Sequence, residues 1–229
     1  MLAWHFLSED KRLGNGDGRV VEVGVPLECK GDPVLCDNGM HGSVRLIDAL
    51  RYAGGPIVCR VKIEGDVIEG DDKLCGRRRT VLWMLDATRI LHEFACQCAE
   101  GALALVEQPD ARSVAGIKAK RAWLDGKITD EELDAAWTAS WAAAQDAAWG
   151  ARAAALSALV AARAVEQDAV PAARSASWDA RDAAARAASE AAAQDATWAA
   201  SLAARDAARD KQNERLTAMV MQAHEKEGV

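Results

Sequence analysis

The first part of the chain alternates between short apolar runs and glycine-rich turns. In the run PIVCRVKI the apolar residues alternate with Arg60 and Lys62, which is typical of a strand with one buried face. Two further runs, rich in valine and leucine, have the same strand-like composition. The strands expected from these patterns are residues 19–25, 56–63 and 80–85.

One amphipathic segment interrupts these strands. Val44, Ile47 and Leu50 recur at helical spacing, and Ser43 stands where a helix N-cap would accept a backbone hydrogen bond. This spacing predicts a helix over residues 43–53. Together with the strands, it predicts a small α+β domain spanning residues 1–86, near the size at which a domain can fold alone.

The periodicity becomes helical after Asp86. Thr129 and Glu132 have the spacing of a capping box, which marks a helix start. The expected helices are residues 87–107, 110–125, 130–167 and 171–224. The last two would be continuous and roughly 55 and 80 Å long. We therefore expect an all-α second part, with connecting helices over residues 87–128 and a long helical arm over 129–229.

Alanine dominates the expected arm, and tryptophans interrupt it at intervals. Alanine favours helix but buries little area, so long alanine faces need a partner helix or a second copy of the chain. The sequence thus predicts an antiparallel hairpin or an oligomeric bundle. The tryptophans have two interpretations, core packing or exposed anchors for a protein partner. They are Trp137, Trp141, Trp149, Trp178 and Trp198.

Composition and charge limit the classes of function. A net charge of −7 argues against general nucleic-acid binding, which needs a basic surface. No uncharged apolar run is long enough to span a membrane, and the first residues lack a secretory pattern, so we expect a cytoplasmic protein. All six cysteines fall in the first 98 residues without a Cys-x-x-Cys pair. We therefore predict neither a metal site nor a cofactor.

The segment CDNGMHGSVR holds the main candidate site. His41 follows a glycine turn and precedes the expected helix, whose N-terminal amides would attract an anion. His41, Ser43 and Arg45 are therefore candidate ligands of a small anionic or nucleotide-like molecule. The alternative is that the His41 imidazole hydrogen-bonds a backbone carbonyl and locks the turn. Three consecutive arginines at 77–79 could contact a phosphate or form a solvated strand edge.

Cys36, Gly39 and His41, followed by a helix and the strand CRVKIEGD, resemble a small domain of unknown function that is widespread in phage and bacterial genomes. Its hallmark is a Cys-x-x-Gly-x-His turn, and the resemblance covers roughly residues 1–107. The alanine-rich tail is similar to helical tails that accompany such domains, some of them in candidate immunity proteins. The resemblance implies a phage- or mobile-element-type accessory protein, located in the host cytoplasm if a phage encodes it.

A second resemblance is to the ADP-ribosyltransferases. Those enzymes use a first-strand histidine, a later tyrosine and a glutamate, in that chain order, to hold NAD and polarise its glycosidic bond. His5, Tyr52 and either Glu64 or Glu69 occur in that order here. The resemblance implies that these residues are catalytic.

From these observations we expect a binding protein and not an enzyme. Its N-terminal domain would bind a protein target or a small anionic ligand. Its arm would self-associate or hold a partner, in a role such as immunity or anti-defence. Two alternatives stay open: an NAD-using enzyme and a structural component of a phage particle.

Overall fold

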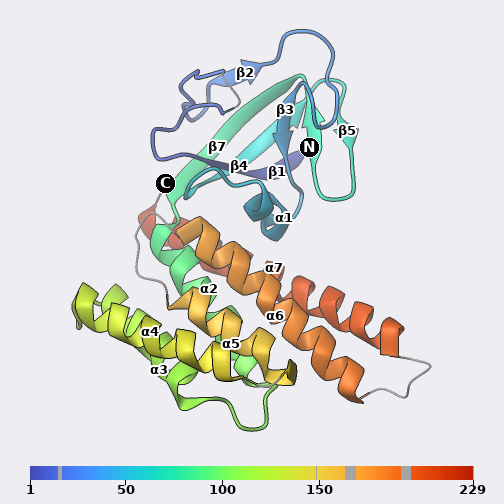
Figure 1. Cartoon of the computed structure of the whole chain (residues 1–229). Helices are drawn as coiled ribbons and strands as arrows, with labels where there is room; N and C mark the ends of the chain where they lie inside the picture. The colour runs from blue at the N-terminus through green and yellow to red at the C-terminus, as the bar shows by residue number, and fades with distance from the viewer. Residues whose placement is uncertain (15–16, 148, 163–168, 192–196, 229) are drawn as a thin grey trace. The chain divides into compact units, whose positions relative to one another are not determined.

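The computed structural model describes the chain except residues 15–16, 148, 163–168, 192–196 and 229. The chain forms two compact units (Figure 1). The first combines Met1–Thr88 with Leu216–Val229, and the second comprises Arg89–Arg215. Antiparallel sheets precede residue 87, and helices follow from Thr88. The expected class, an α+β region followed by an all-α region, is confirmed.

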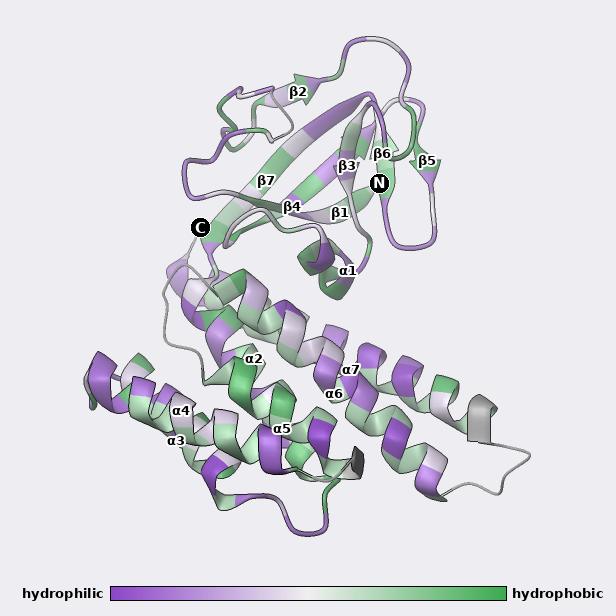
Figure 2. Cartoon of the chain, viewed as in Figure 1, coloured by the Kyte–Doolittle hydropathy of each residue, from purple (hydrophilic) through white to green (hydrophobic). Residues whose placement is uncertain are grey.

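A four-stranded antiparallel sheet forms the centre of the first unit. Its strands are β1 (Leu2–Leu7), β2 (Pro26–Glu28), β4 (Ile57–Glu64) and β7 (Arg78–Asp86), in the order β1-β4-β7-β2. Strands β4 and β7 confirm the strands expected at 56–63 and 80–85. In Figure 2, β7 is hydrophobic over much of its length and hydrophilic toward one end.

The strand expected over residues 19–25 is wrong as a continuous element. Val21 is buried, but Val20 and Val23 form only isolated bridges. Gly24 has a left-handed φ of 79°, which turns the chain before the paired strand begins at Pro26. The valine-rich composition therefore predicted a strand where the chain forms only single bridges to its neighbours.

A smaller sheet contains β3 (Met40–Gly42), β5 (Ile68–Glu69) and β6 (Leu74–Gly76), in the order β3-β6-β5. Ser43 links it to the larger sheet, because its N–H donates to the Trp4 carbonyl at 2.9 Å and its carbonyl accepts from Trp4 at 2.7 Å. Glycine at position 42 permits this approach, since an added Cβ would lie 2.9 Å from Ile63 Cδ1. The core of this unit includes Ala3, Leu7, Val21, Ile57, Cys59, Val61, Ile63, Leu74 and Val81.

Helix α1 (Leu46–Arg51) is shorter than the helix expected over residues 43–53. Arg45 is its N-cap residue, with extended φ and ψ of −99° and 137° and no side-chain cap. Ser43 does not cap the helix, because its backbone is held in the bridge with Trp4. The expectation that Ser43 begins the helix is therefore wrong, and a contact between the sheets overrides the local spacing.

The helices from Thr88 onward form the second unit, except that the last part of the final helix, from Leu216, belongs to the first unit. They are α2 (Thr88–Leu103), α3 (Ala111–Leu124), α4 (Asp130–Asp146), α5 (Trp149–Ala161), α6 (Ala169–Ala191) and α7 (Thr197–Glu227). The expected capping box is confirmed. The Glu132 N–H donates to Thr129 Oγ1 at 3.3 Å, and the Thr129 N–H donates to the Glu132 carboxylate at 2.8 Å.

The two long continuous helices expected after residue 129 are wrong. The first is interrupted at Ala147, whose ψ of 132° is extended, and residues 163–167 of it lie outside the described chain. A helical hairpin of α6 and α7 replaces the second. Gln212 Nε2 donates to the Ser177 carbonyl at 3.1 Å, so α7 runs antiparallel to α6. The expected antiparallel pairing thus occurs inside one chain.

Small side chains allow the helices to approach closely. Between α5 and α6, Ser157 Oγ donates to the Ala176 carbonyl at 3.1 Å. The alanines of these two helices that are completely buried include Ala154, Ala158, Ala173 and Ala176. Each buries little area, so the contact between α5 and α6 depends on close approach of the two backbones.

The elements group into the two compact units as follows. Residues 89–215 form one unit, so the connecting helices and most of the arm pack together. Residues 216–229 belong to the first unit, where the His224 ring stacks on Trp83 with centroids 4.0 Å apart. None of the described helices is both long and apolar enough to cross a bilayer.

We predict that Gly116→Ala destabilises the helical unit. An added Cβ there would lie 2.1 Å from Ser140 Oγ and 3.3 Å from Ala162 Cβ. Such overpacking costs about 1–3 kcal/mol. Gly101→Ala in α2 is the matched control. Nothing lies within 4 Å of its added Cβ, so alanine should stabilise the helix, by about 0.5–1 kcal/mol. Chemical denaturation measures both variants, and equal effects would contradict the close packing of α3 against α4.

Candidate functional site

A cavity of about 950 Å³ lies in the first unit and is lined by residues of both sheets. We name it the Arg79 cavity. Its lining includes Trp4, His5, Leu13, Asp17, Arg19, Glu28, Cys36, Met40, His41, Ser43, Tyr52, Lys73 and Arg79. Pockets for organic ligands span about 300–1,000 Å³, so the volume suits a molecule larger than a bare ion.

His41 fixes one wall of this cavity. Its Nδ1–H donates to the Gly39 carbonyl at 2.9 Å, and its Nε2 accepts from the Cys36 N–H at 3.3 Å. Gly39 has a φ of 133°, a conformation that favours glycine. Burial lowers the pKa of His41 from its ordinary value. The imidazole therefore locks the turn, as one of the two interpretations holds, and also lines the cavity.

Arg79 brings a buried positive charge to the cavity. The residue is only 4% exposed, and its Nη1 donates to the His41 carbonyl at 2.8 Å. Within the described chain, no carboxylate forms an ion pair with this guanidinium. Burial lowers the pKa of Arg79 to about 10, so it stays charged at neutral pH. Burying a charge without a counter-ion costs free energy, and such a charge favours an anionic ligand.

His5 lies on β1 beside this charge. Burial, followed by the charges of Arg79 and His41, lowers the pKa of His5 well below 6.5. Among the described residues, neither imidazole nitrogen of His5 has a hydrogen-bond partner. His5 is thus a neutral base on the cavity wall with its hydrogen-bonding capacity unused.

Some of the other polar lining residues contact one another. The Lys73 ammonium lies 4.4 Å from the Tyr52 ring centroid, and contact with the Cys36 side chain raises the pKa of Lys73. Arg19 holds Asp17 through two hydrogen bonds of 2.7 and 2.6 Å. Arg19 and Asp17 balance each other's charge, whereas Lys73 contacts groups that are not carboxylates and is less buried than Arg79. Arg79 is thus the buried cation of the lining without an ion-pair partner among the described residues.

The structure brings together some of the expected site residues and separates others. His41 and Ser43 line the cavity, although the Ser43 side chain is buried. Arg45 is outside the lining and lies 4.0 Å from the Asp48 carboxylate. His41 and Ser43 therefore do not belong to an anion site at the N-terminus of α1, because this short helix begins beyond Ser43.

Of the residues implied by the ADP-ribosyltransferase resemblance, some line the cavity and others do not. His5 and Tyr52 line the cavity, and the Tyr52 hydroxyl donates to Asp72 at 2.7 Å. Glu64 and Glu69 are not among the lining residues, and Glu64 pairs with Lys62 at 2.7 Å. The arrangement therefore lacks the carboxylate that this chemistry needs at the expected positions.

Sequence reasoning weighed Arg79 only as part of an arginine triplet. The signal that separates it from its neighbours is strand alternation, because Arg79 shares the buried phase of β7 with Val81. Arg77 and Arg78 pair instead with carboxylates at the surface. A charged residue at an inward strand position could have marked the site.

The tryptophans of the helical unit are found in both expected environments. Trp137 is half-buried against a core cluster with Ala144, and its ring centroid lies 6.0 Å from that of Trp141. Trp141 and Trp178 are 48% and 50% exposed. The side chains of Trp149 and Trp198 lie outside the described part of the chain.

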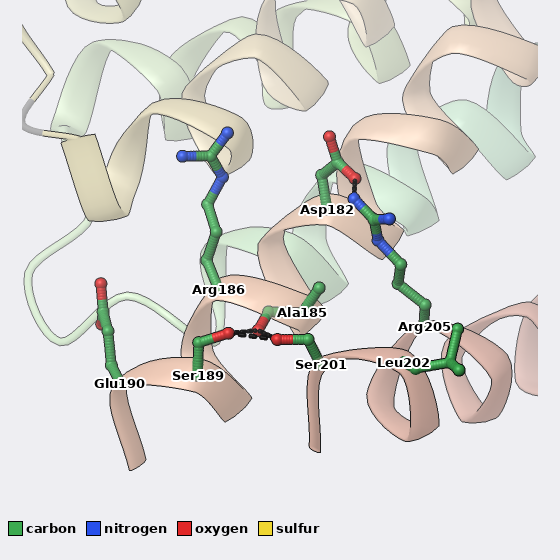
Figure 3. A pocket seen from close by; sticks show the side chains of 8 residues that line it. All are labelled: Asp182, Ala185, Arg186, Ser189, Glu190, Ser201, Leu202 and Arg205. Carbon is green, nitrogen blue, oxygen red and sulfur yellow. Dashed lines mark hydrogen bonds and ion pairs between the residues drawn. The ribbon is translucent and has the colours of Figure 1, made fainter. Parts of the chain in front are cut away.

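A second hollow, of about 480 Å³, lies between α6 and α7 in the helical unit. Figure 3 shows Arg205 reaching Asp182 and the hydroxyls of Ser189 and Ser201 facing each other. These groups satisfy one another across the hairpin, so we interpret this hollow as a polar contact that aligns the two helices.

No metal site emerges from the described residues, in which no group of three or more His, Cys, Asp or Glu side chains is placed to hold an ion. The six cysteines are free thiols. Burial raises the pKa of Cys59, Cys96 and Cys98 to about 12, so these three stay protonated and act as small apolar side chains.

We predict that the free energy of unfolding falls as the pH drops from about 7 to 5, and that the fall is smaller in His5→Gln. The folded-state pKa of His5 lies below its unfolded value. The unfolded chain therefore binds more protons, and acid favours unfolding. The lowered pKa of His41 acts in the same direction, whereas the pKa of Asp179, which burial raises to about 6, acts in the opposite one. The difference between the wild-type chain and His5→Gln therefore isolates the part that belongs to His5. Denaturant titrations measure this, with His224→Gln as the control outside the cavity. An unchanged slope would contradict the lowered pKa of His5.

Residues 1–93 match the family model described as a domain of unknown function (DUF7666). This match contains every residue that lines the Arg79 cavity. No curated protein and no solved structure matches the chain. The expected resemblance to a domain of unknown function is thus confirmed for this region, whereas the Cys-x-x-Gly-x-His hallmark and a phage origin stay predictions.

Proposed function

We propose that the N-terminal unit binds a small anionic ligand in the Arg79 cavity. The observation that carries this proposal is the buried Arg79 guanidinium, which has one carbonyl acceptor and no carboxylate partner in the described chain. An anion would accept from its other N–H groups in charge-assisted hydrogen bonds, which are about twice as strong as neutral ones. It would also offset the cost of burying the charge.

Binding accounts for this geometry better than catalysis does. His5 and Tyr52 line the cavity, which favours NAD cleavage as a second candidate, but Glu64 and Glu69 are not lining residues. Glu28 does line it and is paired with Arg78 at 2.6 Å. Incubation with NAD separates the two functions. Nicotinamide release that disappears in His5→Ala would support the enzyme, and its absence would support binding alone.

The helical unit supplies the second interaction of this proposal, association with another copy of the chain. Its support is the exposure of Trp141 and Trp178, since aromatic side chains are favoured at the centres of protein interfaces. Arg181 lies 4.8 Å from the Trp178 ring centroid and covers part of that ring.

The biological role that fits these interactions is that of an accessory protein of a phage or mobile element, acting in immunity or anti-defence. This step rests on the resemblance of the Cys36–His41 turn and the alanine-rich tail to proteins of that kind. A structural component of a phage particle is the alternative. Co-purification with virions would support that alternative.

We predict that Arg79→Met weakens anion binding by at least about tenfold, because it removes charged hydrogen bonds worth about 1.5–3 kcal/mol each. Isothermal titration of the full chain with phosphate, acetate, AMP and NAD measures the effect. Arg78→Met is the matched control, since Arg78 is the next residue on β7 and lies outside the lining. Equal affinities in both variants, or no binding by the wild-type protein, would contradict the proposal.

We predict that the wild-type chain self-associates and that replacing both Trp141 and Trp178 by alanine shifts it to the monomer. The exposed indoles lose their apolar contact area in the variant. Size-exclusion chromatography with light scattering measures the mass. Leu82→Ala, which changes an exposed apolar residue of the first unit, is the control. A wild-type monomer at high concentration would refute self-association.

A further inference from the structure

The Arg79 cavity has two neighbouring groups with unused capacity for an anion. Arg79 is a buried cation that donates to the His41 carbonyl, and His5 is a base whose nitrogens bond to no described residue. They lie on β7 and β1, on either side of the central strand β4. A ligand that reaches both would meet one fixed positive charge and one group able to become a second.

We propose that the ligand of this cavity is a phosphate monoester, whose dianionic phosphoryl group is shared by Arg79 and a protonated His5, so that binding takes up a proton. The inference rests on the proposed anion binding and specifies its ligand class. The proton comes from solvent and goes to an imidazole nitrogen of His5, and no covalent bond forms or breaks.

The charge balance selects this ligand class over a carboxylate. A carboxylate carries one negative charge, which Arg79 alone neutralises. A phosphate monoester carries nearly two at neutral pH, and a second cation improves its burial. The remaining cavity volume suits the organic part of such an ester, and Leu13, Met40 and Tyr52 supply apolar lining.

His5 is the group around this site that can gain a proton near neutral pH. Cys59, opposite it on β4, stays a neutral thiol because burial raises its pKa to about 12. Arg79 is already charged, with a pKa of about 10. The nearby charged lining residues Asp17, Arg19 and Lys73 have pKa values shifted toward the charged form.

His41 is less able to take this proton. Its Nε2 already accepts from the Cys36 N–H and its Nδ1 bonds to the Gly39 carbonyl, so protonation would break the contact that fixes the turn. The His5 imidazole has no such bond to lose within the described chain. A dianion beside it would raise its pKa by direct attraction.

Calorimetric titration of the full chain with sulfate tests the inference. Sulfate is a dianion that does not titrate near neutral pH, so any proton uptake belongs to the protein. Titrations at about pH 7.5 in buffers of different ionisation enthalpy should give close to one proton taken up per bound sulfate. Acetate should bind with none. AMP should bind at least about tenfold more tightly than sulfate, because it adds apolar contact.

The variants His5→Gln and His224→Gln show which histidine takes up the proton. The proton uptake that accompanies sulfate binding should disappear in His5→Gln. It should persist in His224→Gln, because His224 is not a lining residue of the cavity. Histidine NMR of the wild-type chain gives the same answer without a substitution, as a rise in the His5 pKa on adding sulfate. Anion binding without proton uptake, or uptake that persists in His5→Gln, would overturn the inference and leave the proposed function intact. If no anion binds, the proposed function fails as well.

Discussion

A hydrogen bond from a buried guanidinium joins the two sheets of the N-terminal unit. Arg79 extends from β7 of the larger sheet to the carbonyl of His41 on β3 of the smaller one. The backbone bridge between Trp4 and Ser43 closes the same junction. The shape of the cavity therefore depends on a charged side chain that a purely structural role would not require. An apolar residue could fill an interior position at lower cost, which is why we connect Arg79 to ligand binding.

Much of the fold could be predicted from the sequence, because local pattern and tertiary contact agree there. The alternation in β4 and the Thr129 capping box both fix their elements within a few residues. Prediction fails where a distant contact decides. Ser43 looks like a helix cap but pairs with Trp4. The alanine pattern is similar in α6 and α7, so the sequence does not reveal where one helix ends and the next begins. The expected 80 Å helix was therefore indistinguishable from α6 and α7 folded together.

The candidate site shows the same division. His5, His41 and Tyr52 could be proposed from residue type and order, and all three line the cavity. Arg79 is harder to identify, because it follows two surface arginines in the sequence. Residue type alone does not show that the side chain of Arg79 is buried while that of Arg78 is exposed. Arg45 was proposed on the assumption of a longer helix, and its exclusion follows from where α1 begins. Residue chemistry was thus visible in the sequence, whereas burial required the strand register.

The stacking of His224 on Trp83 has a consequence for how this chain can be divided. The family match ends at residue 93, yet the compact unit that contains the cavity also includes the last fourteen residues, 216–229. A fragment cut at the family boundary would leave one face of Trp83 open to water, and Trp83 packs edge-on against Trp4 of the cavity wall. A different helical tail would therefore have to supply its own cover for Trp83, because the end of this one is part of the compact unit that contains the cavity.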